Sequence, residues 1–198
     1  MIAIIDCCGS NFASIKYAFE KLGQEILLTH DAEEIKKADC VILPGVGHAK
    51  SAMENLRLYG LDTVISQLKQ PVLGICLGMQ IMYSHSEEGD TECLGIFNEK
   101  VKSFRKTQGF SIPHMGWNSL QNINKDHFLF QNIAEDDFVY FVHSFYAEIN
   151  DYSLATNDYI NNFTAIVNKD NFYGIQFHPE KSGEIGVKFL QNFIKGAL

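Results

Sequence analysis

The chain has 198 residues, a net charge of −8, 46% hydrophobic residues and 20% charged residues. This length and composition predict one globular domain, residues 1–198, with a sizeable core. The negative charge disfavours nucleic acid and anionic membranes as partners. No apolar run reaches the roughly 20 residues of a membrane span, and the start lacks a signal peptide's basic region. The five cysteines show neither disulfide-framework nor zinc-ligand spacing, so we expect no metal site and a cytoplasmic location.

Short apolar runs alternate with helical patterns in the first half of the chain. In chain order we expect a strand at 2–6, a helix at 12–22, a strand at 25–29, a helix at 31–37 and a strand at 40–43. After a break at 44–47 we expect helices at 49–59 and 61–70 and a strand at 71–75. Strand–helix alternation with short connections predicts a mostly parallel, doubly wound α/β sheet flanked by helices.

The second half has a different pattern. Strand-like runs occur at 95–104, 137–142, 154–156, 163–168 and 172–177, and they are separated by turn residues. The next long helical pattern is at 184–197, where apolar residues share one face. We therefore expect this half to add antiparallel strands to the sheet.

The segment 72–80 reads Val-Leu-Gly-Ile-Cys-Leu-Gly-Met-Gln. An apolar strand that enters Gly-x-Cys-x-Gly and then a helix is typical of a nucleophile elbow, a sharp turn that exposes its central side chain. The helix N-terminus favours the reactive thiolate of Cys76. The backbone N–H of Leu77 would point at an oxyanion formed there. The alternative at this stage is a buried cysteine in a tight turn.

A catalytic cysteine needs a histidine and a third group that orients the ring. Of the seven histidines, His178 ends an apolar run in the sequence His178-Pro179-Glu180. At the end of a parallel strand, such a side chain enters the crevice where open α/β sheets hold their sites. Pro179 favours an extended His178, and residues two apart then share a face, so Glu180 can reach the imidazole. Alone, this motif could equally be a surface turn.

Together these two motifs resemble those of the class I, or triad, glutamine amidotransferases. Leu43-Pro44-Gly45-Val46-Gly47 is similar to the oxyanion-strand motif of that family. Residues 112–118, Ile-Pro-His-Met-Gly-Trp-Asn, and 140–144, Tyr-Phe-Val-His-Ser, are similar to those of the glutaminase subunits of imidazole glycerol phosphate synthases. The likeness extends from Asp6 to the final helix.

The resemblance implies that glutamine is hydrolysed to glutamate and ammonia through a glutamyl thioester on Cys76. His178 would transfer protons and Glu180 would orient it. The oxyanion would lie between the N–H of Leu77 and the segment Gly45, Val46 and Gly47. The two glycines would let the peptide at Val46 flip, so that the oxyanion hole could form only when a partner binds.

The resemblance also implies a glutamine pocket, lined by Gln80, Glu88 and Ser144. It implies a heterodimer with a synthase (cyclase) subunit, a (β/α)8 barrel that uses the ammonia to form imidazole glycerol phosphate and AICAR in histidine biosynthesis. No cofactor is implied. The expected interface residues are Asn11, Met115, Trp117, Asn118 and Lys181.

Two positions depart from the family pattern: Cys8 replaces a usual glycine, and Phe145 replaces a common tyrosine. These two positions leave the identity of the partner open. The main alternative is a paralogous subunit that feeds a sugar amidotransferase of surface-glycan synthesis. Class I enzymes of GMP, anthranilate or pyridoxal phosphate synthesis fit His-Met-Gly-Trp-Asn less well. A cysteine peptidase or chaperone-like relative, or a non-enzymatic binding module, fits the combined motifs least.

Overall fold

A computed structural model of the chain describes residues 1–6 and 12–197. In this part of the chain, the main sheet has seven strands in the order β11-β12-β13-β4-β3-β1-β2. Their bounds are β1 Ile2–Ile5, β2 Ile26–Thr29, β3 Cys40–Leu43, β4 Val72–Ile75, β11 Ser153–Asp158, β12 Asn162–Lys169 and β13 Phe172–Ile175. The strands from β13 to β2 run parallel, and β11 and β12 pair antiparallel. The predicted α/β class is confirmed.

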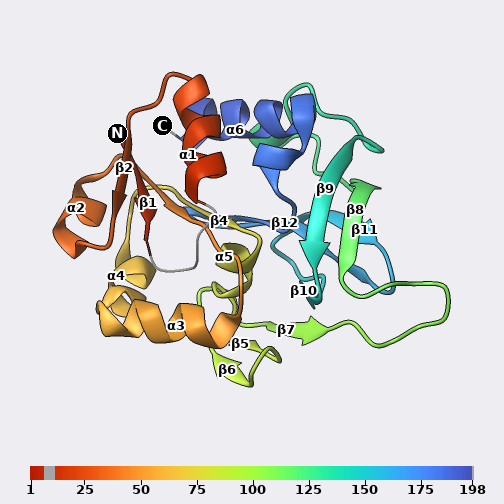
Figure 1. Cartoon of the computed structure of the whole chain (residues 1–198). Helices are drawn as coiled ribbons and strands as arrows, with labels where there is room; N and C mark the ends of the chain where they lie inside the picture. The colour runs from red at the N-terminus through yellow and green to blue at the C-terminus, as the bar shows by residue number, and fades with distance from the viewer. Residues whose placement is uncertain (7–11, 198) are drawn as a thin grey trace.

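Helices cover both faces of the main sheet. Figure 1 shows α1 (Phe12–Lys21) and α6 (Gly183–Ala197) above it, and α3 (Ala49–Leu58), α4 (Leu61–Gln67) and α5 (Leu77–Gln80) below it. Within β1, Ile2 and Ile4 join the core with α1 and α6, whereas Ala3 and Ile5 join the core with α3 and α4. Because both faces are buried, the parallel strands read as continuous apolar runs.

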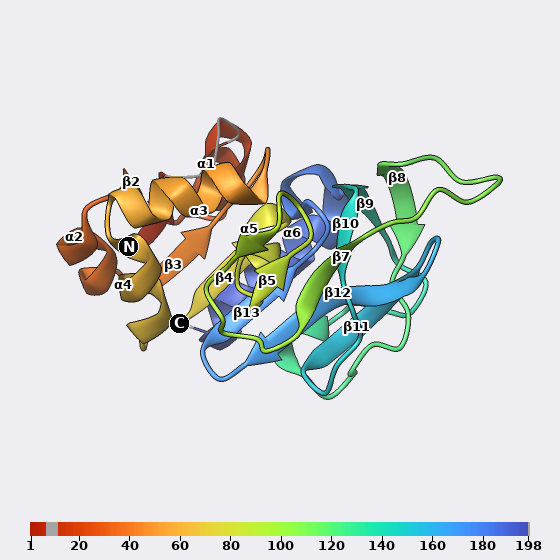
Figure 2. The ribbon, with the colours of Figure 1, turned by 90° about the horizontal axis from the view of Figure 1, so that it is seen from below.

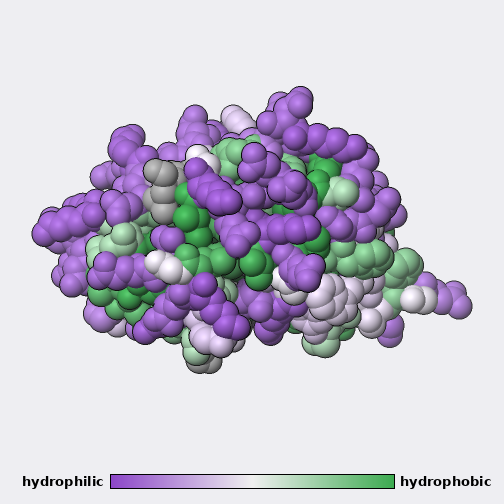
Figure 3. Space-filling model, turned by 90° about the horizontal axis from the view of Figure 1, so that it is seen from above, coloured by the Kyte–Doolittle hydropathy of each residue, from purple (hydrophilic) through white to green (hydrophobic). Residues whose placement is uncertain are grey.

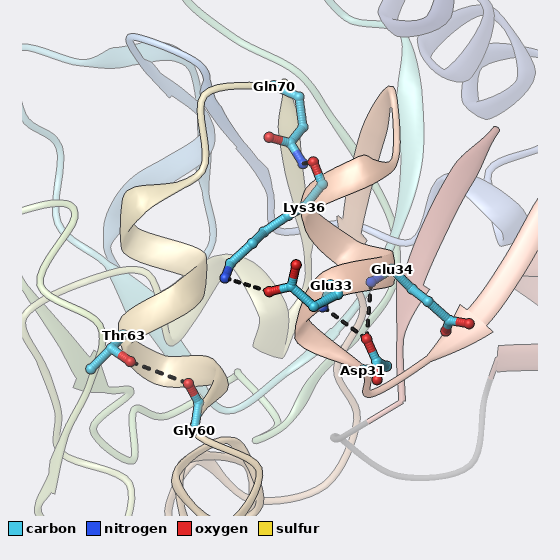
Figure 4. Close-up of polar contacts among 7 residues, drawn as sticks. All are labelled: Asp31, Glu33, Glu34, Lys36, Gly60, Thr63 and Gln70. Atoms are coloured by element: carbon cyan, nitrogen blue, oxygen red, sulfur yellow. Dashed lines mark hydrogen bonds and ion pairs between the residues drawn. The ribbon is translucent and has the colours of Figure 1, made fainter.

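The short helix α2 (Ala32–Lys37) shows how local signals set the boundaries of an element. The carboxylate of Asp31 accepts hydrogen bonds from the backbone N–H groups of Glu33 (2.8 Å) and Glu34 (3.0 Å), as an N-cap residue does (Figure 4). At the other end, the side-chain amide of Gln70 donates to the carbonyl of Ile35 over 2.9 Å. These bonds hold α2 in place between β2 and β3. The helix begins at Ala32, one residue after the predicted start.

The remaining strands form two small sheets beside the main one. The first has the order β10-β7-β5-β6 and the second pairs β8 with β9. Their bounds are β5 His85–Ser86, β6 Thr91–Glu92, β7 Lys100–Ser103, β8 His114–Ser119, β9 Phe138–His143 and β10 Phe145–Ala147. Short 3-10 helices η1 (Phe128–Phe130) and η2 (Pro179–Lys181) complete the elements described.

The second half therefore corrects part of the prediction. Antiparallel strands are added at β11 and β12, as expected, and β13 is parallel to β4, as expected for the strand that ends at His178. However, β7 to β10 do not join the main sheet. The predicted strand 95–104 shortens to β7, and its expected first residue, Gly95, lies in a left-handed turn (φ 67°). The segment between β7 and β8 extends away from the body of the molecule (Figure 2).

The face that carries α1 and α6 is mainly hydrophilic, with hydrophobic side chains gathered along its middle (Figure 3). Residues of α1 and α6 line a hollow there, among them Tyr17, Ala18 and Val187. Within the described residues, no helix is long and apolar enough to cross a membrane.

Candidate active site

The cysteine of the predicted elbow lies at the carboxyl end of β4, directly before α5. Cys76 has φ 54° and ψ −110°, which is unusual for a residue with a side chain. A Cβ atom on Gly78 would lie 1.7 Å from the carbonyl oxygen of Leu43, so only glycine fits the close approach of α5 to β3. The local sequence therefore builds a strained turn that holds the thiol at the edge of the sheet.

The predicted histidine and glutamate follow the neighbouring strand β13, which pairs in parallel with β4. Nδ1 of His178 lies 2.8 Å from Oε1 of Glu180, and their side chains are 5% and 1% exposed. His178 is extended (φ −98°, ψ 100°), in agreement with the effect of Pro179. Its backbone N–H donates to the carbonyl of Tyr140 over 2.9 Å, so β9 also holds it.

The pKa shifts distinguish His178 from two cysteines elsewhere in the chain. Burial disfavours the charged imidazole of His178, but its hydrogen bonds to Cys76 and Glu180 and their charges raise its pKa to about 10. The ring is therefore an imidazolium at neutral pH, ready to donate a proton. In contrast, burial raises the pKa of Cys40 to about 12 and that of Cys93 to about 11, so both remain unreactive thiols.

The predicted oxyanion segment follows β3 and passes beside the elbow. Val46, Gly47 and Leu77 line the same cavity as the thiol. Gly47 has φ 103°, a conformation that side chains disfavour. Gly45 does not line the cavity, but a Cβ atom there would lie 2.6 Å from the backbone nitrogen of Gly78. Its role in the structure is the close packing of this segment on the elbow.

The cavity beside the thiol has a volume of about 300 Å³, and the predicted substrate residues Gln80, Glu88 and Ser144 all line it. The side-chain amide of Gln80 donates to the carbonyl of Phe145 (2.8 Å) and to Oε1 of Gln176 (2.9 Å). Oε2 of Glu88 accepts from the backbone N–H of Ala49 over 2.7 Å. Both polar side chains are thus held in place by the protein.

Several residues of the site were not identified from the sequence. Pro113, Val142, His143 and Phe145 line the cavity. The thiol of Cys76 lies 3.7 Å from the carbonyl oxygen of Val142 and 3.7 Å from Nε2 of Gln176. Most of these residues lie inside the motifs quoted above or next to them, so the sequence indicated the right segments. No pattern in the sequence showed which side chains or carbonyls would contact the sulfur.

The predicted interface residues differ in their exposure. Met115 and Trp117 on β8 are 61% and 54% exposed, so the tryptophan is not a core residue. Asn118 points inward instead and donates to Oδ1 of Asn157 (3.0 Å) and to the carbonyl of Asp158 (3.1 Å). Lys181 is exposed and also lines the cavity. Asn11 and Cys8 lie outside the described residues.

A cysteine on a strand–helix elbow, beside a buried histidine–glutamate pair on a parallel sheet, defines a class of α/β protein with a cysteine–histidine–carboxylate constellation. The family described as glutamine amidotransferase class-I matches residues 3–197. The chain belongs to this family.

Relatives and solved structures agree with this assignment. The chain is 48% identical over 196 residues to imidazole glycerol phosphate synthase subunit HisH of Bacteroides fragilis (strain YCH46), covering 98% of each chain. It is 49% identical to imidazole glycerol phosphate synthase subunit HisH 2 of Legionella pneumophila (strain Paris), covering 98% of this chain and 97% of the relative. The structure of PurLQS from Thermotoga maritima shares the fold, with a TM-score of 0.71, 21% identity and coverage of 98% of this chain and 97% of the other.

Proposed function

We propose that the protein hydrolyses glutamine at Cys76, His178 and Glu180 and delivers the ammonia to a synthase partner for imidazole glycerol phosphate and AICAR formation in histidine biosynthesis. The observation that carries the hydrolysis is the elbow cysteine beside the buried His178–Glu180 pair. The names and full-length identity of the HisH relatives support the pathway. A cytoplasmic location follows from that pathway.

In the first half of the reaction, Sγ of Cys76 attacks the γ-amide carbon of glutamine and forms a tetrahedral adduct. The oxyanion accepts hydrogen bonds from the N–H of Leu77 and from an N–H near Val46, each worth on the order of 3 kcal/mol. His178 gives its proton to the amide nitrogen, the carbon–nitrogen bond breaks, and ammonia leaves a glutamyl thioester.

In the second half, His178 is neutral and takes a proton from a water molecule. The resulting hydroxide attacks the thioester carbonyl, the carbon–sulfur bond breaks, and glutamate leaves. The thiolate and the imidazolium are then restored. Glu180 accepts from Nδ1 throughout, so Nε2 always faces the sulfur.

The walls of the cavity suit an amino-acid substrate. Glu88 offers a carboxylate to the substrate ammonium through the oxygen that does not bind Ala49. Gln80 uses both amide hydrogens on protein acceptors, so it presents only its carbonyl oxygen to a ligand. Ser144 supplies a further polar group. The cavity volume of about 300 Å³ suits a small substrate of this kind.

The partner surface comprises Met115, Trp117 and Lys181, with Asn11 as a further expected member. Exposed Met and Trp side chains are typical of interface cores. By family resemblance, the partner is a (β/α)8 barrel and the assembly a heterodimer. The glycines around Val46 allow its peptide to flip, so that hydrolysis is slow until the partner is bound.

The test is a glutaminase assay of the purified chain, alone and with the histidine-pathway cyclase and its nucleotide ligand. We expect weak activity alone and strong activation in the complex. Cys76→Ala should abolish ammonia release, preserve complex formation and leave synthesis from free ammonia intact. Activation only by a sugar amidotransferase would move the protein to glycan synthesis, and full activity without any partner would refute the gating. Peptidase activity without glutaminase activity would refute the proposal as a whole.

A further inference from the structure

A buried pair of histidines lies between the exposed strand β8 and the cavity. Nδ1 of His114, on β8, is 2.9 Å from Nε2 of His143, at the end of β9. Nδ1 of His143 is 2.8 Å from the carbonyl oxygen of Phe145. The two residues are 3% and 5% exposed, and neither has a role in the reaction described above. Aromatic rings pack against the pair, including those of Phe141 and Phe163.

These contacts fix the direction of every hydrogen bond in the pair. A carbonyl oxygen can only accept, so Nδ1 of His143 carries a proton and, in a neutral ring, Nε2 must accept. Nδ1 of His114 is therefore the donor, and its Nε2 is an acceptor that faces the amide of Asn118 at 3.4 Å. Burial lowers the pKa of His114 to about 4 and that of His143 to about 3, which keeps both rings neutral.

The chain of hydrogen bonds continues from Phe145 to the nucleophile. The carbonyl of Phe145 also accepts from the amide of Gln80, the same amide donates to Oε1 of Gln176, and Nε2 of Gln176 donates to Sγ of Cys76. Each amide has its oxygen and nitrogen assigned by its neighbours. A continuous path of hydrogen bonds thus joins His114 to the sulfur, and the carbonyl oxygen of Phe145 accepts from both sides of it.

We propose that His114 and His143 are positioning residues of the glutaminase site, which hold the Cys76 thiol in register with β8 through Phe145, Gln80 and Gln176. This inference rests on the proposed function. Along β8, His114 points inward, whereas Met115 and Trp117 are exposed. A partner that shifts β8 therefore moves the first member of the path. Because buried polar groups are costly to leave unpaired, a shift of His114 is followed by the other groups of the path, which keep their hydrogen bonds.

The decisive comparison is between His114→Phe, which keeps the ring shape but cannot donate, and His114→Asn, whose amide nitrogen is as many bonds from Cβ as Nδ1 of histidine and can therefore donate to His143. A matched control is His127→Phe, because His127 stacks on Phe128 far from the path and has no bond to it. The measurements are glutaminase kcat and KM in the complex, and the iodoacetamide alkylation rate of Cys76 in the free chain, followed by peptide mass spectrometry. The alkylation does not require glutamine hydrolysis.

Loss of one hydrogen bond in the path should lower kcat by about tenfold in His114→Phe and slow Cys76 alkylation to a similar extent, with KM little changed. His114→Asn should restore both rates, and His127→Phe should keep wild-type rates even if it lowers Tm. Wild-type rates in His114→Phe, or equal losses in the Phe and Asn variants, would overturn the proposal.

Two further outcomes remain distinguishable. If the wild-type complex releases no ammonia, the proposed function fails, and the alkylation rates still decide whether His114 positions the thiol. If His114→Phe does not fold, His114→Leu replaces it, because its apolar side chain cannot donate to His143. Slow alkylation in the Leu variant and a normal rate in the Asn variant would support the positioning role, and equal rates would overturn it.

Discussion

Backbone strain at the elbow predicts an unusual stability difference at Cys76. At φ 54° and ψ −110°, a residue with a Cβ atom stores about 2 kcal/mol of strain. Cys76→Ala keeps the Cβ atom and therefore the strain, whereas Cys76→Gly releases it. Both variants lack the nucleophile, so their stabilities can be compared without regard to activity.

The expected difference in stability between Cys76→Gly and Cys76→Ala is obtained by comparison with the same Ala-to-Gly change at an ordinary buried site. In β1, Ala3 is fully buried. Replacing it with glycine should cost about 0.7 kcal/mol of chain entropy and about 0.8 kcal/mol of methyl burial, roughly 1.5 kcal/mol together. At position 76 the same Ala-to-Gly change also gains about 2 kcal/mol of released strain, so Cys76→Gly should be about 0.5 kcal/mol more stable than Cys76→Ala.

Urea unfolding and calorimetry measure both effects. For a chain of this size each kcal/mol shifts Tm by about 2–4 °C. Ala3→Gly should therefore lower Tm by roughly 5 °C relative to wild type, and Cys76→Gly should melt roughly 1–2 °C above Cys76→Ala. If the glycine variant were about 1.5 kcal/mol less stable than the alanine variant, as at an unstrained buried site, the turn would store no strain and the reasoning would fail.

Three further predictions concern titration and the partner surface. Burial disfavours the charged ring of His178, but Cys76 and Glu180 raise its pKa to about 10. ¹⁵N NMR should therefore show an imidazolium at pH 8, and Glu180→Gln should lower the pH at which the ring titrates. A neutral wild-type ring at pH 8 would contradict this prediction. Burial lowers the pKa values of His114 and His143 below the ordinary value, so their stabilising effect is complete above about pH 6.5 and is lost as the pH falls towards their folded-state values. Each ring should cost about 2 kcal/mol of unfolding free energy between pH 7 and pH 5, so His114→Asn should reduce the loss measured by urea unfolding by about 2 kcal/mol; an unchanged loss would argue against this. Trp117→Ala should weaken cyclase binding about 30-fold, or about 2 kcal/mol, with little change in Tm, and calorimetry that finds equal affinity would remove Trp117 from the interface.

The sequence predicted the parts of the fold that depend on local patterns. The parallel strands were recognisable as short apolar runs, and the elbow was recognisable because Gly74 and Gly78 flank the cysteine at fixed spacing. Strand β8 was not predicted as a strand. Its sequence contains Gly116 and alternates buried His114 with exposed Met115 and Trp117, so its apolar side chains do not mark a buried face.

The hydrogen-bond path could not be predicted, because it depends on contacts between distant segments. Gln80 meets Phe145 and Gln176 only when α5, β10 and β13 are packed together. The sequence indicated Gln80 as a pocket residue, but its periodicity carries no information on the two acceptors that orient the amide. Likewise, no sequence pattern indicated that His114 and His143 are neighbours, because they meet only when β8 and β9 pair in register.

The position of the site follows from the ends of three adjacent strands. The oxyanion segment follows β3, Cys76 follows β4 and His178 follows β13, and these strands are neighbours in the parallel sheet. The missing side chain of Gly78 lets the end of β3 lie directly against the elbow, since any Cβ atom there would collide with Leu43. The nucleophile and the oxyanion segment are therefore packed as one unit, and a movement of either must be accommodated by the other. If the proposed function holds, this coupling gives a partner that contacts the chain beside this unit a direct physical route to the rate of hydrolysis.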